Sequence, residues 1–150
     1  MQKLNLPEYS FKITTSEDKK QWIYDSFRKK NILLTPEEWV RQNILNFLII
    51  EKEYPASLIS IESGIKVNQL VRRYDALVHD RNGYPLMLIE CKAPEIAVNQ
   101  NTFDQISAYN LSVLARYLLI SNGIKHYCCK LNESGNSFDF LDEIPFYNSL

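Results

Sequence analysis

Two carboxylates and one ammonium group flank a predicted chain reversal: Asp75 precedes the dipeptide Asn82-Gly83, and Glu90 and Lys92 follow it. Asn-Gly is typical of the two central positions of a type I′ hairpin turn, because both positions need a positive φ. Counting outward from such a turn places Asp75 directly opposite Glu90. Opposed residues on antiparallel strands share a face, with Cβ atoms about 4.5–5.5 Å apart. The spacing therefore predicts two converging carboxylates.

Two adjacent carboxylates repel each other unless a cation lies between them, and hard divalent ions such as Mg²⁺ or Mn²⁺ prefer carboxylate oxygen and water. Lys92 lies two residues beyond Glu90 and so shares its face of the strand, while Cys91 points the other way. Such an ion polarises a phosphate and acidifies a water, and a lysine can orient or deprotonate that water. The set is suited to hydrolysis of a phosphodiester bond.

The alternative interpretation is a solvated, salt-bridged hairpin face, which is common for mixed charges on a surface. The neighbouring residues count against it. Residues 76–78 and 86–89 are near-continuous apolar runs, which are typical of strands covered on both faces. Charges at the ends of buried strands need a reason, and a functional site is the usual one.

The helices and strands that must position these residues can be predicted from the hydrophobic pattern and from the capping and turn residues. A helix is expected over 35–51, where Thr35 can cap, Pro36 suits the first helical position and Glu38 can return to the cap in a capping box. A second helix is expected over 102–114. Strands are expected at 58–62, 71–79, 84–92, 117–121, 126–131 and 137–141, and two N-terminal strands at 9–14 and 22–27 could pair. This order predicts an α/β fold with a central mixed sheet flanked by helices.

Three runs carry a family resemblance: Arg-Tyr-Asp at 73–75, Asn-Gly at 82–83 and Ile-Glu-Cys-Lys-Ala-Pro at 89–94. They resemble the Asp…Glu-x-Lys core of the PD-(D/E)XK nuclease superfamily. The stretch from Thr35 to about Gly123 more closely resembles the N-terminal nuclease domain of type I restriction enzyme R subunits. The resemblance implies a restriction-endonuclease-like fold with an αβββαβ core, and cleavage of DNA with Mg²⁺ or Mn²⁺.

The resemblance also implies roles for individual residues. Asp75, Glu90 and the backbone carbonyl of Cys91 would be metal ligands, and Lys92 would be the catalytic lysine. A glutamate of the first helix would join the site. Glu37 and Glu38 both fit, and Glu38 is favoured because it shares a helical face with Gln42 and Leu45.

Three further residues are expected at the nucleic acid. Gln105 and Tyr109 lie four apart on one helix face and resemble the Gln-x-x-x-Tyr motif of recombination nucleases and R subunits. The alternative is a surface glutamine beside a core tyrosine. Arg73 could contact a phosphate or pair with the acidic cluster. In the inferred register Arg73 would face Lys92, and that repulsion predicts a bulge near Asp75.

Composition sets the remaining bounds. The 150 residues predict one domain over 1–150, with its core at about 35–123. The net charge of −1 argues against a strongly basic nucleic-acid binder but not against a nuclease, because bound cations supply positive charge. No signal or membrane-spanning segment is evident, so a cytoplasmic location is expected. The three cysteines predict no disulfide or zinc site, and His79 and His126 have no ligand-spaced partners.

The function expected from these residues is that of a metal-dependent deoxyribonuclease. None of the four glycines fits a phosphate-binding loop of the kind that translocases need. The protein is expected to act on DNA, either as a free-standing nuclease or together with a separate specificity or translocase subunit, and a homodimer is left open. Two alternatives remain: a non-catalytic DNA-binding or assembly module of a restriction system, and a nuclease that acts on RNA.

Overall fold

The computed structural model describes residues 1–61, 64–67 and 70–150, and for 64–67 and 70–73 it describes the backbone alone. The helices are α1 (Pro36–Asn46) and α2 (Gln100–Val113), with short helical turns at η1 (Phe47–Glu51), η2 (Ala56–Leu58) and η3 (Tyr147–Ser149). The N-terminal strands are β1 (Ile13–Thr15), β2 (Gln21–Asp25) and β3 (Lys30–Leu33). The other strands are β4 (Ile59–Ile61), β5 (Gly64–Val67), β6 (Leu70–Arg73), β7 (Ala76–His79), β8 (Pro85–Cys91), β9 (Tyr117–Ser121), β10 (His126–Leu131) and β11 (Phe138–Phe140).

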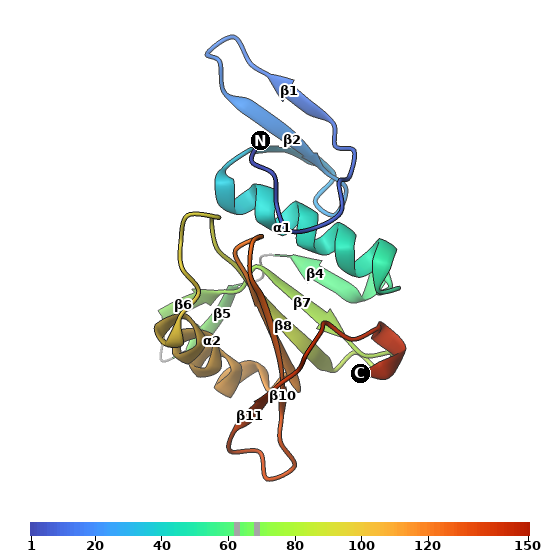
Figure 1. The fold of residues 1–150 in the computed structure, drawn as a ribbon, viewed down its shortest axis with the longest axis vertical. Coiled ribbons are helices and arrows are strands. Elements are labelled where there is room, and N and C mark those ends of the chain that lie inside the picture. Colours follow the sequence, from blue (N-terminus) through green and yellow to red (C-terminus); the bar gives the residue numbers. More distant parts are fainter. Residues whose placement is uncertain (62–63, 68–69) are drawn as a thin grey trace.

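A mixed six-stranded sheet in the order β11-β10-β9-β8-β7-β4 forms the centre of the molecule (Figure 1). Strands β8 and β9 run parallel, and every other neighbouring pair in this sheet is antiparallel. The parallel pair is connected through α2, as a parallel crossover requires. The predicted α/β fold, with the order α1, β4, β7, β8, α2, β9 at its core, is confirmed.

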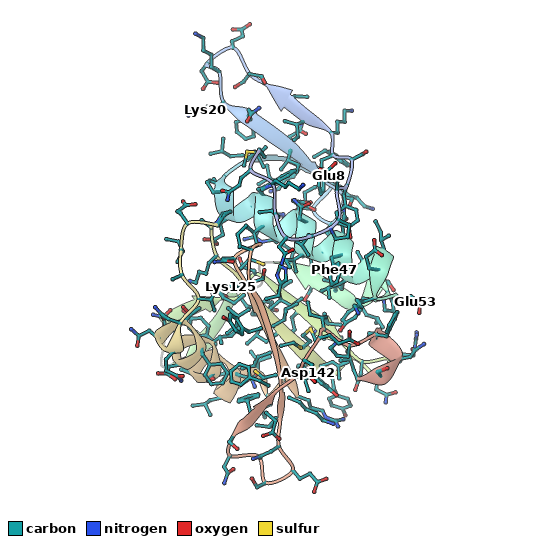
Figure 2. All side chains as sticks on the ribbon, in the orientation of Figure 1. Glu8, Lys20, Phe47, Glu53, Lys125 and Asp142 are labelled. Carbon is teal, nitrogen blue, oxygen red and sulfur yellow. The ribbon has the colours of Figure 1, made fainter. Side chains whose placement is uncertain are left out.

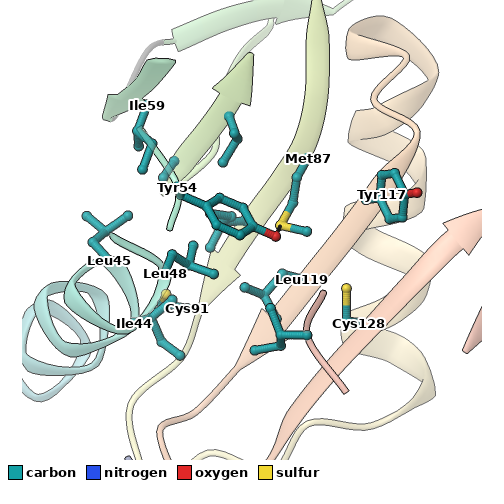
Figure 3. Close-up of a cluster of buried hydrophobic side chains, with 14 of the residues drawn as sticks. Ile44, Leu45, Leu48, Tyr54, Ile59, Met87, Cys91, Tyr117, Leu119 and Cys128 are labelled. Atoms are coloured by element: carbon teal, nitrogen blue, oxygen red, sulfur yellow. Dashed lines mark hydrogen bonds between the residues drawn. The ribbon is translucent and has the colours of Figure 1, made fainter. Parts of the chain in front are cut away.

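The two helices cover opposite faces of this sheet, as the two separate buried clusters show. On one face Ile44 of α1 packs with Met87 and Leu119 of the sheet, together with Leu45, Leu48 and Tyr54 (Figure 3). On the other face, Ile106 of α2 packs against alternate residues of the same strands: Leu88, Leu118 and Ile120. Both faces of β8 and β9 are thus buried, which is why their sequences are almost continuously apolar.

Helix α1 begins as its sequence predicts, because Thr35 accepts a hydrogen bond from the Glu38 N–H at 3.1 Å and Pro36 occupies the first turn. The expected second half of the capping box is wrong. The N–H of Thr35 donates to the carbonyl of Leu33, and the Glu38 carboxylate turns into the interior instead. After Asn46 the helix continues through the π-helical turn η1 to Glu51, so the predicted end of the helical segment is confirmed.

A separate three-stranded sheet, β1-β2-β3, extends beyond α1 on the side away from the central sheet (Figure 1). The side chain of Lys20 stands near the outer end of its first hairpin (Figure 2). The predicted pairing of two N-terminal strands is confirmed in shortened form, since Ile13 pairs with Ile23 and β2 ends at Asp25. Strand β3 was not anticipated from the sequence.

The central hairpin keeps the predicted register although its turn differs from the prediction. Among the described turn residues only Gly83 has a positive φ, +86°, so the turn is not type I′. The N–H of Asp80 instead donates to the carbonyl of Tyr84, which makes a three-residue loop. A register shift between Val78 and His79 offsets this change, and Ala76 therefore pairs with Ile89 as counting from Asn82-Gly83 predicts.

The strand expected over 71–79 is in fact two strands, and this corrects the prediction. Strand β6 ends at Arg73 and pairs with β5, where Arg73 faces Gly64 and not Lys92. Strand β7 starts at Ala76, and Asp75 lies in the break between them. The bulge expected near Asp75 lies instead between Val78 and His79.

Among the described residues, no helix is long and apolar enough to cross a lipid bilayer.

Candidate active site

Asp75 lies at the start of β7, one residue before the paired segment, and it is buried with 6% of its surface exposed. Both of its carboxylate oxygens accept hydrogen bonds. Oδ2 accepts from the backbone N–H of Cys91 at 2.6 Å, and Oδ1 accepts from Nη2 of Arg41 at 2.7 Å. The first bond ties Asp75 to the end of β8, and the second ties it to α1.

Glu90 and Lys92 lie at the adjacent end of β8 and form an ion pair, with 3.5 Å between Lys92 Nζ and Glu90 Oε1. Burial and, next, the charge of Asp75 raise the pKa of Glu90 to about 8, although Lys92 acts in the opposite direction. Burial disfavours the charged form of a carboxyl, and a like charge nearby adds to this effect. The hydrogen bond from the Cys91 N–H places the Asp75 carboxylate beside the end of β8 that carries Glu90, so the two negative charges oppose each other.

The raised pKa of Glu90 predicts a pH-dependent change in stability for Glu90→Gln. The folded protein holds the Glu90 proton up to about pH 8, whereas the unfolded chain loses it near 4.5. The wild-type stability contributed by this group therefore falls as pH rises from about 4.5 through 8. Glu90→Gln lacks this penalty, so we expect its free energy of unfolding at pH 9 to exceed that of wild type by roughly 1–3 kcal/mol.

Urea denaturation of both proteins at pH 5 and pH 9, with chelator present, measures this difference. The gain of Glu90→Gln should be present at pH 9 and largely absent at pH 5. Equal stabilities of the two proteins at both pH values would contradict a raised pKa of Glu90 in the folded protein.

The two candidate glutamates of α1 have different surroundings. Glu38 is buried, and its carboxylate accepts hydrogen bonds from Arg28, Arg41 and Gln42 at 2.7, 2.9 and 3.0 Å. Glu37 is exposed, yet burial of its carboxyl and the charge of Asp75 raise its pKa, while Lys92 opposes this. The charges of Asp75 and Lys92 thus act on the Glu37 carboxyl directly, whereas Glu38 is connected to Asp75 through Arg41.

Two arginines of this site were not anticipated from the sequence. Arg41 bridges Glu38 and Asp75, and Arg28 reaches Glu38 from the turn before β3. Arg41 did leave a signal, because it stands three residues after Glu38 on a helix whose neighbouring positions, Val40 and Ile44, are apolar. A buried arginine on such a helix needs acidic partners. Arg28 left no comparable pattern.

The residues expected at the nucleic acid are placed as follows. Gln105 is exposed on α2, and Tyr109 is half-buried and packs against the cluster that contains Ile106 and Tyr74. The backbone of Arg73 belongs to β6, and its side chain lies outside the described part of the structure.

The histidines and cysteines have ordinary surroundings. His79 Nδ1 lies 3.2 Å from the carbonyl of Leu58, and His126 bonds both Ser121 and the backbone of Asn5. The cysteines are free thiols, and all of them are buried: Cys91, Cys128 and Cys129. The Cys91 side chain packs in the hydrophobic cluster beneath α1, where burial raises the pKa of its thiol, and the backbone N–H of Cys91 donates to Asp75.

The donor set fits a hard divalent cation bound with few protein ligands. Among the described residues there is no group of three or more His, Cys, Asp or Glu side chains arranged to hold a metal ion. Mg²⁺, however, commonly uses one or two carboxylates and completes its shell with water and substrate phosphate. The charge of Asp75 raises the pKa of Glu90, which is the repulsion that a bound cation would relieve.

An open groove of about 670 Å³ leads to the α1 side of this site. Lys30 of β3 and Glu37 of α1 contribute to its walls, and Ala93, directly after Lys92, closes one side. Arg28 and Arg41 also line the groove. Glu38 and Glu95 line it too, so acidic and basic side chains both face the groove.

The fold and the site define an α/β domain that presents a carboxylate pair and a lysine at the end of its central hairpin. The chain belongs to the family described as type I restriction enzyme R protein N terminus, whose model matches residues 36–145. A comparison with curated proteins finds no match.

A solved structure with the same fold is a fragment of a putative HsdR subunit of a type I restriction enzyme from Vibrio vulnificus YJ016. The superposition gives a TM-score of 0.53 at 17% sequence identity and covers 75% of this chain. It covers 24% of the Vibrio chain, so this protein corresponds to about a quarter of that fragment.

Proposed function

We propose that this chain is a metal-dependent DNA endonuclease domain of the PD-(D/E)XK type, acting in a type I restriction system. The observation that carries the proposal is that Asp75, which accepts a hydrogen bond from the Cys91 N–H, lies next to the Glu90–Lys92 ion pair at the end of the central hairpin, in a chain of the R-protein family. The solved relative is described as a restriction enzyme subunit, which agrees with DNA as the substrate.

In this mechanism Asp75, Glu90 and the carbonyl of Cys91 hold Mg²⁺ or Mn²⁺, which when bound would polarise the phosphate and acidify a water. Lys92 orients that water or stabilises the negative charge that develops on the phosphate. Its Nζ lies 3.5 Å from Glu90 Oε1, so the ammonium is held beside the carboxylates. Glu38 supports Asp75 through Arg41, and Glu37 borders the groove.

Gln105, Tyr109 and Arg73 are proposed to contact the nucleic acid, with Gln105 and Tyr109 next to each other on α2. The resemblance to R subunits implies that a nuclease domain of this kind works together with DNA-translocating and sequence-recognising activities. We therefore propose that a specificity or translocase subunit, or further parts of the same polypeptide, supplies these activities.

The direct test of the proposal is a cleavage assay with double-stranded DNA, single-stranded DNA and RNA. We expect DNA to be cut in the presence of Mg²⁺ or Mn²⁺, and cleavage to stop with chelator. Cleavage of RNA alone would reassign the substrate. DNA binding without cleavage of any substrate would favour the non-catalytic assembly module.

Metal binding gives an independent prediction. Wild-type protein is expected to bind Mn²⁺ weakly without nucleic acid, because the site offers few protein ligands. Asp75→Asn should weaken this binding further, since it removes one of the two charged ligands while keeping the shape of the side chain. Isothermal calorimetry with Mn²⁺ on both proteins measures the difference, and identical isotherms would show that Asp75 is not a ligand.

A further inference from the structure

A network of ion pairs connects the N-terminal sheet to the candidate active site. Asp25 of β2 pairs with Arg28, and Nη2 of Arg28 lies 2.7 Å from Oε1 of Glu38. The same Glu38 oxygen lies 2.9 Å from Nη1 of Arg41, whose Nη2 lies 2.7 Å from Oδ1 of Asp75. Asp25 belongs to β2 and Arg28 to the turn that follows it, and both precede residues 36–145 that match the family.

The Asp75 carboxylate, at the end of this network, accepts a hydrogen bond at each of its oxygens. Arg41 Nη2 donates to Oδ1, and the Cys91 N–H donates to Oδ2 at 2.6 Å. An ionised carboxylate has about four lone-pair positions, so two donors leave about half of them available. Because the donors come from α1 and from β8, the carboxylate cannot rotate without breaking one of these bonds.

The net charge of this network of ion pairs is compatible with a cation bound at Asp75. Each arginine stands between two carboxylates: Arg28 between Asp25 and Glu38, and Arg41 between Glu38 and Asp75. Three carboxylates and two guanidinium groups leave one net negative charge. Glu38 therefore offsets the positive charge of Arg41, which would otherwise repel a cation bound at Asp75.

We propose that Arg41, held in place by Glu38 and Arg28, is a positioning residue that orients the Asp75 carboxylate for cation binding. The cation is the one assigned in the proposed function, on which this part of the inference rests. A planar guanidinium suits the task because its fixed fork of donors can bind two carboxylates at once, which a lysine cannot do in the same geometry. The N-terminal sheet, through Asp25 and Arg28, supports the site from outside the segment that matches the family.

The test uses two variants of Arg41 and one control. Arg41→Lys keeps the charge but loses the fork. The double variant Arg41→Met with Glu38→Gln removes the anchor without changing the net charge, and Met fills the volume of the buried arginine, so folding should persist. The control is Lys20→Met, which breaks the exposed Lys20–Asp18 pair on the N-terminal sheet. Urea denaturation establishes that each protein is folded.

The first readout needs no metal. The amide resonance of Cys91 reports its hydrogen bond to Asp75, and in chelator we expect it to shift in both Arg41 variants and to stay unchanged in Lys20→Met. The second readout is the affinity for Mn²⁺ by calorimetry. Hydrogen-bond partners of metal ligands typically contribute about 10–100-fold in affinity, so both variants should bind Mn²⁺ about 10–100-fold more weakly than wild type.

The outcomes separate this inference from the proposed function. Folded Arg41 variants that keep the wild-type Cys91 resonance and the wild-type Mn²⁺ affinity would overturn the positioning role and leave Arg41 as a stabilising residue only. A shifted Cys91 resonance in a protein whose wild type binds no Mn²⁺ would uphold the orientation of Asp75 by Arg41 and overturn the metal-dependent function.

Discussion

Lys92→Ala is expected to lower the rate of DNA cleavage by about two to four orders of magnitude, the range over which general acid–base and electrostatic groups act. The ammonium lies beside Glu90 with 27% of the Lys92 side chain exposed, and the next residue, Ala93, lines the groove. Its truncation removes little packing beyond the aliphatic stem. The substitution should therefore lower the turnover rate and leave the folded structure intact.

The experiment compares the wild type and Lys92→Ala on single- and double-stranded DNA with saturating Mg²⁺. Lys92 also lowers the pKa of Glu90, so the variant should hold the Glu90 proton to a higher pH and is best assayed near pH 9. Lys20→Ala, an exposed lysine at the far hairpin, serves as the matched control (Figure 2). Circular dichroism checks the fold, and a variant that cuts as fast as wild type would refute the proposed mechanism.

The register counted from Asn82-Gly83 agrees with the observed pairing of the central hairpin, although the predicted turn does not. Asn82-Gly83 suggested a two-residue turn, and the structure has a three-residue loop with Gly83 at positive φ. The bulge between Val78 and His79 then restores the pairing of Ala76 with Ile89. Because the apolar residues of β7 and β8 are buried on both faces, their pattern alone does not set the register, and the longer loop and the bulge cancel each other.

The ion network around Asp75 could not be predicted in the same way. Arg41 and Asp75 are far apart in sequence and meet only because α1 packs on the face of the sheet beside β7 and β8. The break of the strand at Asp75 is equally tertiary in origin. The local composition of 71–79 is that of one strand. In the structure the strand is interrupted, and the Cys91 N–H donates to the side chain of Asp75.

Glu37 and Glu38 are adjacent in sequence, yet alanine substitution should lower the free energy of unfolding at Glu38 and leave it nearly unchanged at Glu37. Glu38→Ala leaves Arg28 and Arg41 without a shared acceptor in the interior, and loss of one partner of a buried ion pair typically costs about 3–5 kcal/mol. Glu37→Ala should change the free energy of unfolding by less than about 0.5 kcal/mol, because the residue is exposed. Urea denaturation at pH 7 measures both values.

The same pair of variants distinguishes a glutamate that acts on the substrate from one that holds the site together. Glu38→Gln keeps an acceptor for Arg41, so we expect it to recover much of the stability that Glu38→Ala loses. Glu37→Ala should alter cleavage more than stability, because the Glu37 carboxyl senses Asp75 and Lys92 and borders the groove. If Glu38→Ala is as stable as Glu37→Ala, the buried network does not stabilise α1 against the sheet, and the support that Arg41 gives to Asp75 loses its physical basis.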